Sequence, residues 1–267
     1  MLAYSVKEFR KRIQMAQIVW SQYLRPPAKA ASFNFKSDLF PKFPKDILVK
    51  ALDINHTTVE LPEGITRRTL SRAGILLAYV CRDSLEVLKP FIAQDPFSVG
   101  LYSAIESGPV DFQAAQIMNK SDKSFSEGYR ENVNPKMYFH SMPSLPAAHL
   151  SIYLGIQGRV AAFTDSVSGG RMAILQAERD LNSGQIQAAL VCGAFSHENP
   201  FVVLREHQRC EQGQILCEGA AAVILVPDSE KSILSGSAQS TDAERFGNCQ
   251  DFFELEMCKT ENMSRAK

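Results

Sequence analysis

The chain has 267 residues, of which 45% are hydrophobic, 9% aromatic and 22% charged. This is ordinary globular composition, and the length allows one large domain or two small ones with a substantial core. Lysine plus arginine count 29, as do aspartate plus glutamate, so the formal net charge is zero. A neutral chain lacks the basic excess that binding to phosphates uses, which argues against a nucleic-acid partner.

Hydropathy argues against a membrane protein. The longest apolar stretches, over residues 73–81 and 219–226, are much shorter than the roughly 20 residues that a bilayer-spanning helix needs. Charged residues between positions 7 and 12 interrupt any signal-peptide core near the N-terminus. We therefore expect a cytoplasmic protein that does not associate with a membrane.

The cysteines indicate neither disulfides nor a metal site. The chain has six of them, without a CxxC pair or a dense framework. Cys210 and Cys217, with His207 nearby, match no zinc spacing. We expect no metal and no cofactor.

Taken in chain order, the sequence first predicts an extended, partly irregular covering segment over residues 1–65. Within it, residues 6–23 fit either an amphipathic helix or a strand. From Thr66, which can serve as an N-cap, apolar residues recur at helical spacing as far as Pro90. This pattern predicts one helix. Residues 99–106 predict a buried strand that a Ser-Gly-Pro sequence ends.

The next region is polar in its first part. A helical stretch is predicted near residues 110–118, followed by a polar loop through Glu131. Downstream, apolar strands alternate with helices, which indicates an α/β layered domain over residues 66–228. The predicted strands cover 160–163, 188–193 and 220–226, and the predicted helices cover 147–154, ending at Gly155, and 168–181, ending at Gly184.

Residues 229–267 form a polar, charged C-terminal tail. We expect this tail to be mobile or to dock on another surface, as chain ends without an apolar pattern commonly do.

A turn of small residues, Thr164-Asp165-Ser166-Val167-Ser168-Gly169-Gly170, joins a predicted strand to a predicted helix. The unpaired N–H groups and the dipole of a helix N-terminus favour an anion, which suits a nucleophile or an oxyanion. Serine also serves as a purely structural cap at such turns. These residues alone leave both interpretations open.

Several ordered motifs in residues 134–226 are similar to those of one enzyme family. Residues 142–152 follow the pattern M-x-N-x-x-A-x-x-x-S-I, with Ser144 in place of asparagine, and Gly155 and Gly158 match the G-x-x-G that comes next. Residues 164–169 stand where the family has T-A-C-x-S-G, and residues 218–220 match its E-G-A. On these motifs the segment resembles the N-terminal half of the β-ketoacyl synthases of the thiolase superfamily. The resemblance implies an α/β chain with a partial thiolase-like layered fold.

Two departures from the family bear on activity. Ser166 stands at the position of the family's cysteine nucleophile, and a serine hydroxyl attacks thioesters poorly without a nearby base. The family's two catalytic histidines lie in an H-G-T-like motif and a later G-H motif, and no histidine here matches either. We therefore expect no catalytic residue. His140 and His149 are predicted to pack or to form hydrogen bonds, and His56, His197 and His207 to lie in loops.

A ketosynthase-like chain without its nucleophile resembles a chain-length factor of a type II polyketide synthase, and the short form resembles subunits of bacterial aryl polyene synthesis. The resemblance implies a heterodimer with a full-length β-ketoacyl synthase, which brings in an acyl carrier protein. By the same resemblance, Met137 and Tyr138 lie where one subunit approaches the acyl tunnel of its mate.

Half of a thiolase-type fold leaves apolar faces that a partner is expected to cover. Two alternatives stay open at this point. The chain could be a serine-dependent acyl-thioester transferase or hydrolase that uses Ser166, or a structural relic that only stabilises its partner.

Overall fold

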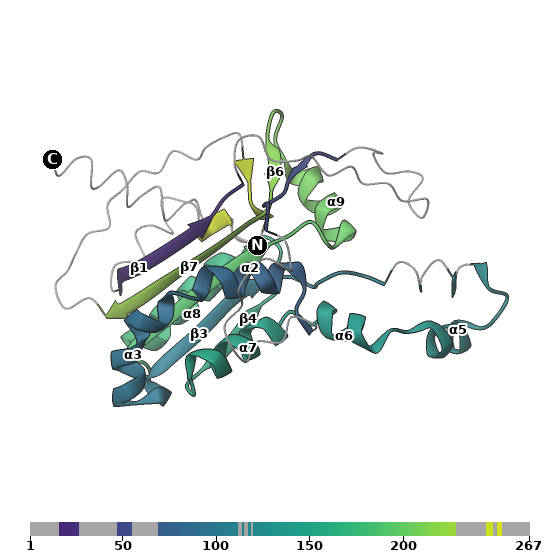
Figure 1. Cartoon of the computed structure of the whole chain (residues 1–267). Helices are drawn as coiled ribbons and strands as arrows, with labels where there is room; N and C mark the ends of the chain where they lie inside the picture. Colours follow the sequence, from purple (N-terminus) through teal and green to yellow (C-terminus); the bar gives the residue numbers. More distant parts are fainter. Residues whose placement is uncertain are drawn as a thin grey trace.

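A five-stranded sheet forms the centre of the molecule (Figure 1). The computed structural model describes residues 16–26, 47–54, 69–111, 114, 117–118, 120–227, 244–247 and 250–252. The strand order is β1-β7-β5-β3-β4. The strands are β1 (Ala16–Leu24), β3 (Val99–Ile105), β4 (Val160–Phe163), β5 (Ala188–Phe195) and β7 (Gly219–Pro227).

The sheet is mixed. β3 pairs in parallel with β4 and β5, whereas β7 pairs antiparallel with β5 and with β1. Every residue of β3 and β5 is buried, as expected of central strands that are covered on both faces. The predicted strands at 99–106, 160–163, 188–193 and 220–226 and the α/β class are confirmed.

β1 agrees with the strand alternative for residues 6–23 over the part of that range that the structure describes. Its nine residues pair with β7 and extend the sheet there, with a shift of register between Ile18 and Trp20. Residues 1–15, 27–46 and 55–65 of this region lie outside the described residues.

Helices cover both faces of the sheet. α2 (Arg72–Cys81), α3 (Ser84–Gln94) and α7 (Leu145–Leu154) share one apolar cluster with the face of β3 that carries Leu101 and Ile105. α8 (Gly169–Asn182) and α9 (Pro200–Arg209) share the cluster on the opposite face, with Tyr102 and Ala104. Alternate side chains of β3 therefore belong to two apolar clusters, one on each face of the sheet. The predicted helices at 147–154 and 168–181 are confirmed, with Gly155 and Gly184 at positive φ where they end.

The helix predicted from Thr66 to Pro90 is two helices. α2 begins after Ser71, whose Oγ accepts a hydrogen bond from Gly74 N at 3.2 Å, and the chain turns at 82–83 before α3. Pro90 lies inside α3 and does not end it, and Thr66 lies outside the described residues. A short 3₁₀ helix, η2 (Pro96–Ser98), then leads into β3.

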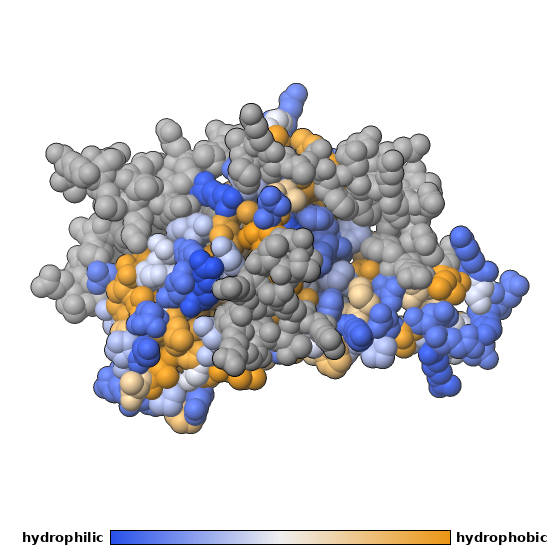
Figure 2. All heavy atoms as spheres, viewed as in Figure 1, coloured by the Kyte–Doolittle hydropathy of each residue, from blue (hydrophilic) through white to orange (hydrophobic). Residues whose placement is uncertain are grey.

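An arm with α5 (Phe125–Asn132) and α6 (Pro135–Ser141) extends from the body of the molecule (Figure 1). The polar loop predicted through Glu131 is therefore wrong over α5. Ser124 and Glu127 form a reciprocal capping box, a local signal that stabilises a helix without a buried face. Figure 2 shows apolar side chains among strongly hydrophilic ones on this arm.

A second sheet of three short parallel strands lies beside the first: β2 (Val49–Lys50), β6 (Ile215–Cys217) and β8 (Glu244–Arg245). β8 belongs to the predicted C-terminal tail. Phe246 and Phe252 of the same region are buried in the core of the domain, so the described part of the tail docks on the chain itself. Among the helices of the described residues, none has the length and hydropathy to span a membrane.

Candidate functional site

The Ser166 turn lies between the end of β4 and the first turn of α8. Asp165 organises it. Its Oδ1 accepts hydrogen bonds from Val167 N at 2.9 Å, from Ser168 N at 2.6 Å and from Ser168 Oγ at 2.8 Å. These bonds, first of all the one from the Ser168 amide, lower the pKa of Asp165 below its ordinary value. Two amides of the turn therefore already have an anionic acceptor from the chain itself.

Ser166 is half-buried and lies next to a guanidinium group. Its Oγ is 3.1 Å from Arg209 Nη1, and its carbonyl oxygen is 3.4 Å from the same nitrogen. A guanidinium group donates hydrogen bonds and has no lone pair with which to take a proton. No hydrogen bond described for Ser166 involves a histidine, which leaves the hydroxyl without a general base among these contacts.

Arg209 belongs to a charged network around the buried carboxylate of Glu206. Glu206 Oε1 accepts hydrogen bonds from Arg209 Nη1 at 2.7 Å and from Arg205 Nε at 3.2 Å. Its Oε2 accepts two from Arg245, at 2.9 and 3.1 Å. Arg205 also pairs with Glu106, whose pKa is raised by burial although Arg205 opposes that effect. The network holds Arg209 against the Ser166 turn.

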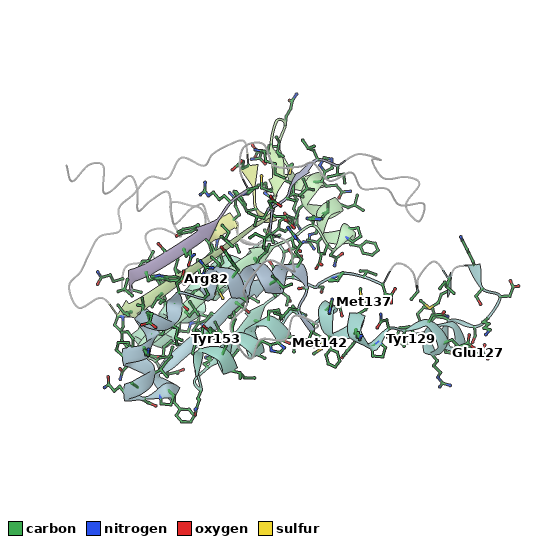
Figure 3. The ribbon with its side chains drawn as sticks, viewed as in Figure 1. Arg82, Glu127, Tyr129, Met137, Met142 and Tyr153 are labelled. Atoms are coloured by element: carbon green, nitrogen blue, oxygen red, sulfur yellow. The ribbon has the colours of Figure 1, made fainter. Side chains whose placement is uncertain are left out.

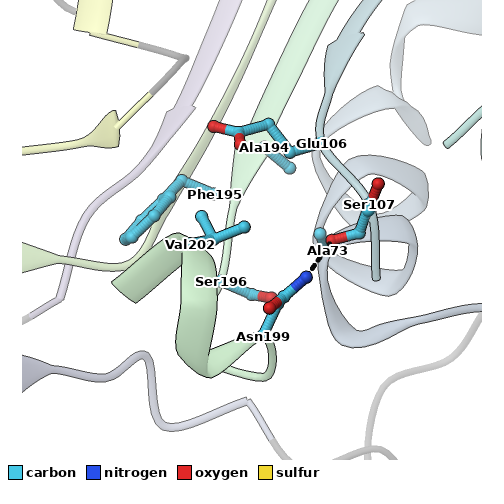
Figure 4. Close-up of a pocket in the computed structure, with 8 residues that line it drawn as sticks. All are labelled: Ala73, Glu106, Ser107, Ala194, Phe195, Ser196, Asn199 and Val202. Atoms are coloured by element: carbon cyan, nitrogen blue, oxygen red, sulfur yellow. Dashed lines mark hydrogen bonds between the residues drawn. The ribbon is translucent and has the colours of Figure 1, made fainter. Parts of the chain in front are cut away.

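A small pocket lies near the carboxyl ends of β3 and β5, where α9 begins (Figure 4). Asn199 closes one side, because its Nδ2 donates to the carbonyl oxygens of Ser107 and Gly108 at 3.2 and 2.9 Å. The space holds roughly one water molecule and is too small for an acyl chain. Its lining consists of Ala73, Glu106, Ser107, Ala194, Phe195, Ser196, Asn199 and Val202.

Glu218, from the E-G-A motif, is the centre of a buried ion-pair cluster. Arg72 contacts both of its carboxylate oxygens at 2.7–2.8 Å, and His197 Nδ1 lies 2.5 Å from Oε1. Burial by itself raises the pKa of Glu218, but the bonds from His197 and Arg72 outweigh burial and lower it to about 2. The Leu52 amide also donates to Oε2 at 2.9 Å. This carboxylate joins four segments and has a structural role.

In the hydrogen bonds described, none of the remaining histidines contacts the Ser166 turn. His149 Nε2 is 3.1 Å from Thr69 Oγ1, in agreement with the predicted hydrogen-bonding role, and His197 follows β5 in a loop as predicted. His207 lies inside α9, so the loop prediction for it is wrong. His56 lies outside the described residues.

Met137 and Tyr138 lie on α6, a helix without a buried residue. Figure 3 shows Met137 on this helix. The Tyr138 side chain is 59% exposed, and its ring is 6.1 Å from that of Phe139 in an edge-on arrangement. Both residues are therefore accessible on the arm. Their position at a tunnel or an interface stays a prediction.

β4 is an edge strand, because it pairs with β3 on one side only in the described sheet. Exposed apolar residues lie on it and on the elements around it. They are Val160 on β4, Ile152 on α7, Val167 in the Ser166 turn and Met172 in α8, and the most exposed of them is Ile152 at 80%. An unprotected apolar sheet edge is typical of a surface that another chain covers.

The family model of the β-ketoacyl synthase N-terminal domain matches residues 66–231, more than half of the chain. This chain belongs to the β-ketoacyl synthase family. The match includes the Ser166 turn and Glu218. A search of curated proteins finds no match.

Solved ketosynthase structures share the fold of this family member. The AntDE:AntF complex, a type II polyketide synthase acyl-carrier protein with its ketosynthase, has a TM-score of 0.58 at 15% identity, over 80% of this chain and 62% of that chain. A β-ketoacyl synthase from Burkholderia phymatum STM815 gives 0.55 at 17% identity, over 81% and 60%. The ketosynthase ApeO in complex with its chain length factor ApeC, from Xenorhabdus doucetiae, gives 0.57 at 15% identity, over 85% and 60%. The chain thus spans about three fifths of the length of these chains.

Sequence reasoning singled out Ser166 but missed its neighbours. Arg205 and Arg209 lie four residues apart with Glu206 between them, a spacing that places the two arginines on one face of a helix. That pattern was readable in the sequence. Its closeness to Ser166 was not, because the two segments are 43 positions apart in the chain.

Proposed function

We propose that this ketosynthase-family chain is a non-catalytic, chain-length-factor-like subunit. It pairs with a full-length β-ketoacyl synthase, meets acyl carrier protein through that complex, and helps determine the length of the product. The proposed pathway class, aryl polyene synthesis, rests on the resemblance of the sequence to the short ketosynthase-like subunits of those systems.

The observation that carries the proposal is the contact between Ser166 and Arg209. An acyl-transferring serine needs a base that takes its proton as the hydroxyl attacks. The group 3.1 Å from Ser166 Oγ is a guanidinium, held in place by the buried Glu206. A cation at this position cannot serve as that base.

The Asp165 carboxylate supports the same conclusion. Acyl transfer passes through an oxyanion that free backbone N–H groups stabilise. At this helix N-terminus Asp165 already accepts hydrogen bonds from the amides of Val167 and Ser168. A second negative charge at these amides would meet electrostatic repulsion from the carboxylate. The serine-enzyme alternative therefore gains no support from this site.

The surface supports a partner subunit. The open edge of β4 and the exposed apolar residues around it form one candidate interface. The arm with α5 and α6 forms another, since α6 has no buried residue of its own. ApeO, a structural neighbour, is described in complex with its chain length factor, which is the type of assembly proposed here.

Reconstituted chain elongation tests the proposal. The chain is combined with a full-length β-ketoacyl synthase with which it supports elongation, and products are measured for the Ser166→Ala variant and for a partner whose nucleophilic cysteine is replaced by alanine. We expect Ser166→Ala to lose about 1 kcal/mol of stability with its hydrogen bond and to leave turnover nearly unchanged. The change in the partner should abolish synthesis, because no acyl thioester can form there.

Size-exclusion chromatography of each variant pair provides the control for an intact complex. A loss of turnover by orders of magnitude in an intact Ser166→Ala complex would favour the serine-dependent acyl transferase and refute a non-catalytic role.

A further inference from the structure

Glu106 places a carboxylate oxygen in the interior of the protein without a hydrogen-bond partner. The residue directly follows β3, and only 9% of its side chain is exposed. Its Oε2 pairs with Arg205 of α9, whereas Oε1 is buried and no described residue gives it a hydrogen bond. In native proteins, buried polar atoms that the chain itself does not satisfy commonly bond to an ordered water molecule.

The Glu106 side chain also lines the small pocket of Figure 4. This pocket lies where the apolar clusters of the two sheet faces meet, because Ala73 and Ala194 belong to one cluster and Phe195 and Val202 to the other. The pocket has room for about one water molecule. Its size therefore excludes organic ligands and leaves water or a single small ion.

The other polar residues of the lining are Ser107, Ser196 and Asn199. The Asn199 amide is already engaged, since its Nδ2 donates to the carbonyl oxygens of Ser107 and Gly108 and its Oδ1 accepts from Phe201 N at 3.1 Å. The serine hydroxyl groups can both donate and accept hydrogen bonds. Together with a carboxylate oxygen, they suit a ligand that also donates and accepts.

The charges around Glu106 favour a neutral ligand over a cation. Arg205 already balances the Glu106 carboxylate and also donates to Glu206 at 3.2 Å. A cation at Glu106 Oε1 would lie close to this guanidinium group and be repelled by it. Among the described residues, no three histidine, cysteine or acidic side chains are arranged to hold a metal ion. Water satisfies Oε1 whether the carboxyl group is ionised or protonated, because water both donates and accepts.

We propose that this pocket is a binding site for one water molecule, which bonds to Glu106 Oε1 and to the hydroxyl groups of the lining. The water allows the Glu106 carboxyl group to stay in the interior, where its Oε2 anchors Arg205. Arg205 and Arg209 both donate to Glu206 Oε1, and Arg209 contacts Ser166. The water site is thus at the far end of the network that holds Arg209 against the Ser166 turn.

A high-resolution crystal structure of the full chain tests the site. We expect electron density for a water molecule at about 2.5–3.0 Å from Glu106 Oε1. If this density is absent, or if a protein group bonds to Oε1 instead, the proposal is wrong. Crystals grown in a rubidium salt test for a cation, because rubidium scatters X-rays anomalously. An anomalous peak beside Oε1 would assign the site to a monovalent cation and would also overturn the proposal.

Two variants of α9 test whether the water occupies this pocket. Val202 lines the pocket and lies three residues before Arg205, so both project from one face of the helix. Val202→Ile adds one methylene group, which should displace the water from the crystal structure. Val203→Ile, at a buried position outside the lining, is the matched control and should keep the water.

A water that is retained in both variants, or lost from both, would contradict this assignment. Where a variant fails to fold, the crystal structures of the unmodified chain decide.

Discussion

At the scale of single residues, Glu178 is a buried carboxyl group in α8 for which the described residues supply no charged partner. Its side chain is 5% exposed, and Oε1 has no hydrogen-bond partner among the described residues. Burial disfavours the charged form and raises the pKa of Glu178 to about 8. The folded protein therefore keeps a proton on Glu178 at pH 7 that the unfolded chain releases near its ordinary pKa of 4.5.

The raised pKa of Glu178 predicts that the protein loses stability as the pH rises. Because the folded state binds one more proton between about pH 4.5 and 8, stability falls as the pH rises through this window, by at most about 1.4 kcal/mol per pH unit. Glu178→Gln does not titrate, so its advantage in the free energy of unfolding should grow from pH 5 to pH 8 and then level off. Urea unfolding at several pH values measures it, with the exposed Glu211→Gln as control. A constant difference across the window would contradict the prediction.

The contribution of Glu218 to stability depends on pH in the opposite direction. Its pKa is lowered to about 2, so its ion pairs contribute stability above pH 4.5 that is lost as the pH falls towards 2. At pH 7, Glu218→Gln should cost about 3 kcal/mol or more, because Arg72 stays buried without its counterion. This difference should shrink in acid. Glu244→Gln, which breaks the partly exposed pair with Lys50, is the matched control and should cost about 1 kcal/mol or less. Equal losses in the two variants would argue against a special role of Glu218.

At the scale of elements, the arm is held by its ends and not by a buried face. α5 depends on its capping box, and α6 begins after Asn134, whose side chain accepts a hydrogen bond from Lys136 N at 3.0 Å. Such helices can present nearly all of their side chains to a partner. This arrangement is the basis for the prediction on Met137.

Met137→Trp should shorten the products of the reconstituted pair, if the arm borders the acyl tunnel as proposed. Extra volume in a packed apolar channel has few places to go, so it takes space from the growing chain. Product lengths are measured by mass spectrometry. Phe125→Trp on α5 of the same arm is the matched control and should leave the lengths unchanged. An unaltered distribution for Met137→Trp in an intact complex would place this residue outside the tunnel.

At the scale of the whole molecule, the main sheet formed by the described residues has two edge strands. β1 forms one edge and β4 the other, and each carries a valine that is 42% exposed, Val19 on β1 and Val160 on β4. Exposed apolar neighbours gather around β4, which makes this edge the proposed partner surface.

Co-expression with the ketosynthase should yield a complex with equal copies of both chains, as measured by light scattering. Val160→Asp should weaken this complex by at least roughly tenfold, since a charge is costly in the apolar centre of an interface. Val19→Asp, equally exposed on the opposite edge, should change the affinity little. A stable monomer that ignores the ketosynthase would refute the assembly, and equal effects of both variants would refute the assignment of the β4 edge.

Local pattern by itself determined much of the fold. β3, β4, β5 and β7 are short apolar runs between turn residues, and α8 has a clear helical period with glycine after its end. These signals depend on neighbouring residues only. The same is true of the family motifs, which identified the Ser166 turn. Where the periodicity continued across Arg82 and Asp83, local pattern merged two helices into one, because the break there has no proline or glycine to mark it.

Only the tertiary structure decided what surrounds Ser166. Arg209, which contacts its hydroxyl, is 43 positions away in the chain. The buried ion pair of Arg72 and Glu218 likewise joins residues that are 146 positions apart. The burial that shifts the pKa values of Glu178 and Glu218 is likewise a property of the packed core. Phe252 likewise packs against Gly193 of β5, a residue from a distant part of the chain. Contacts of this kind follow from how the layers pack, and no local spacing in the sequence encodes them.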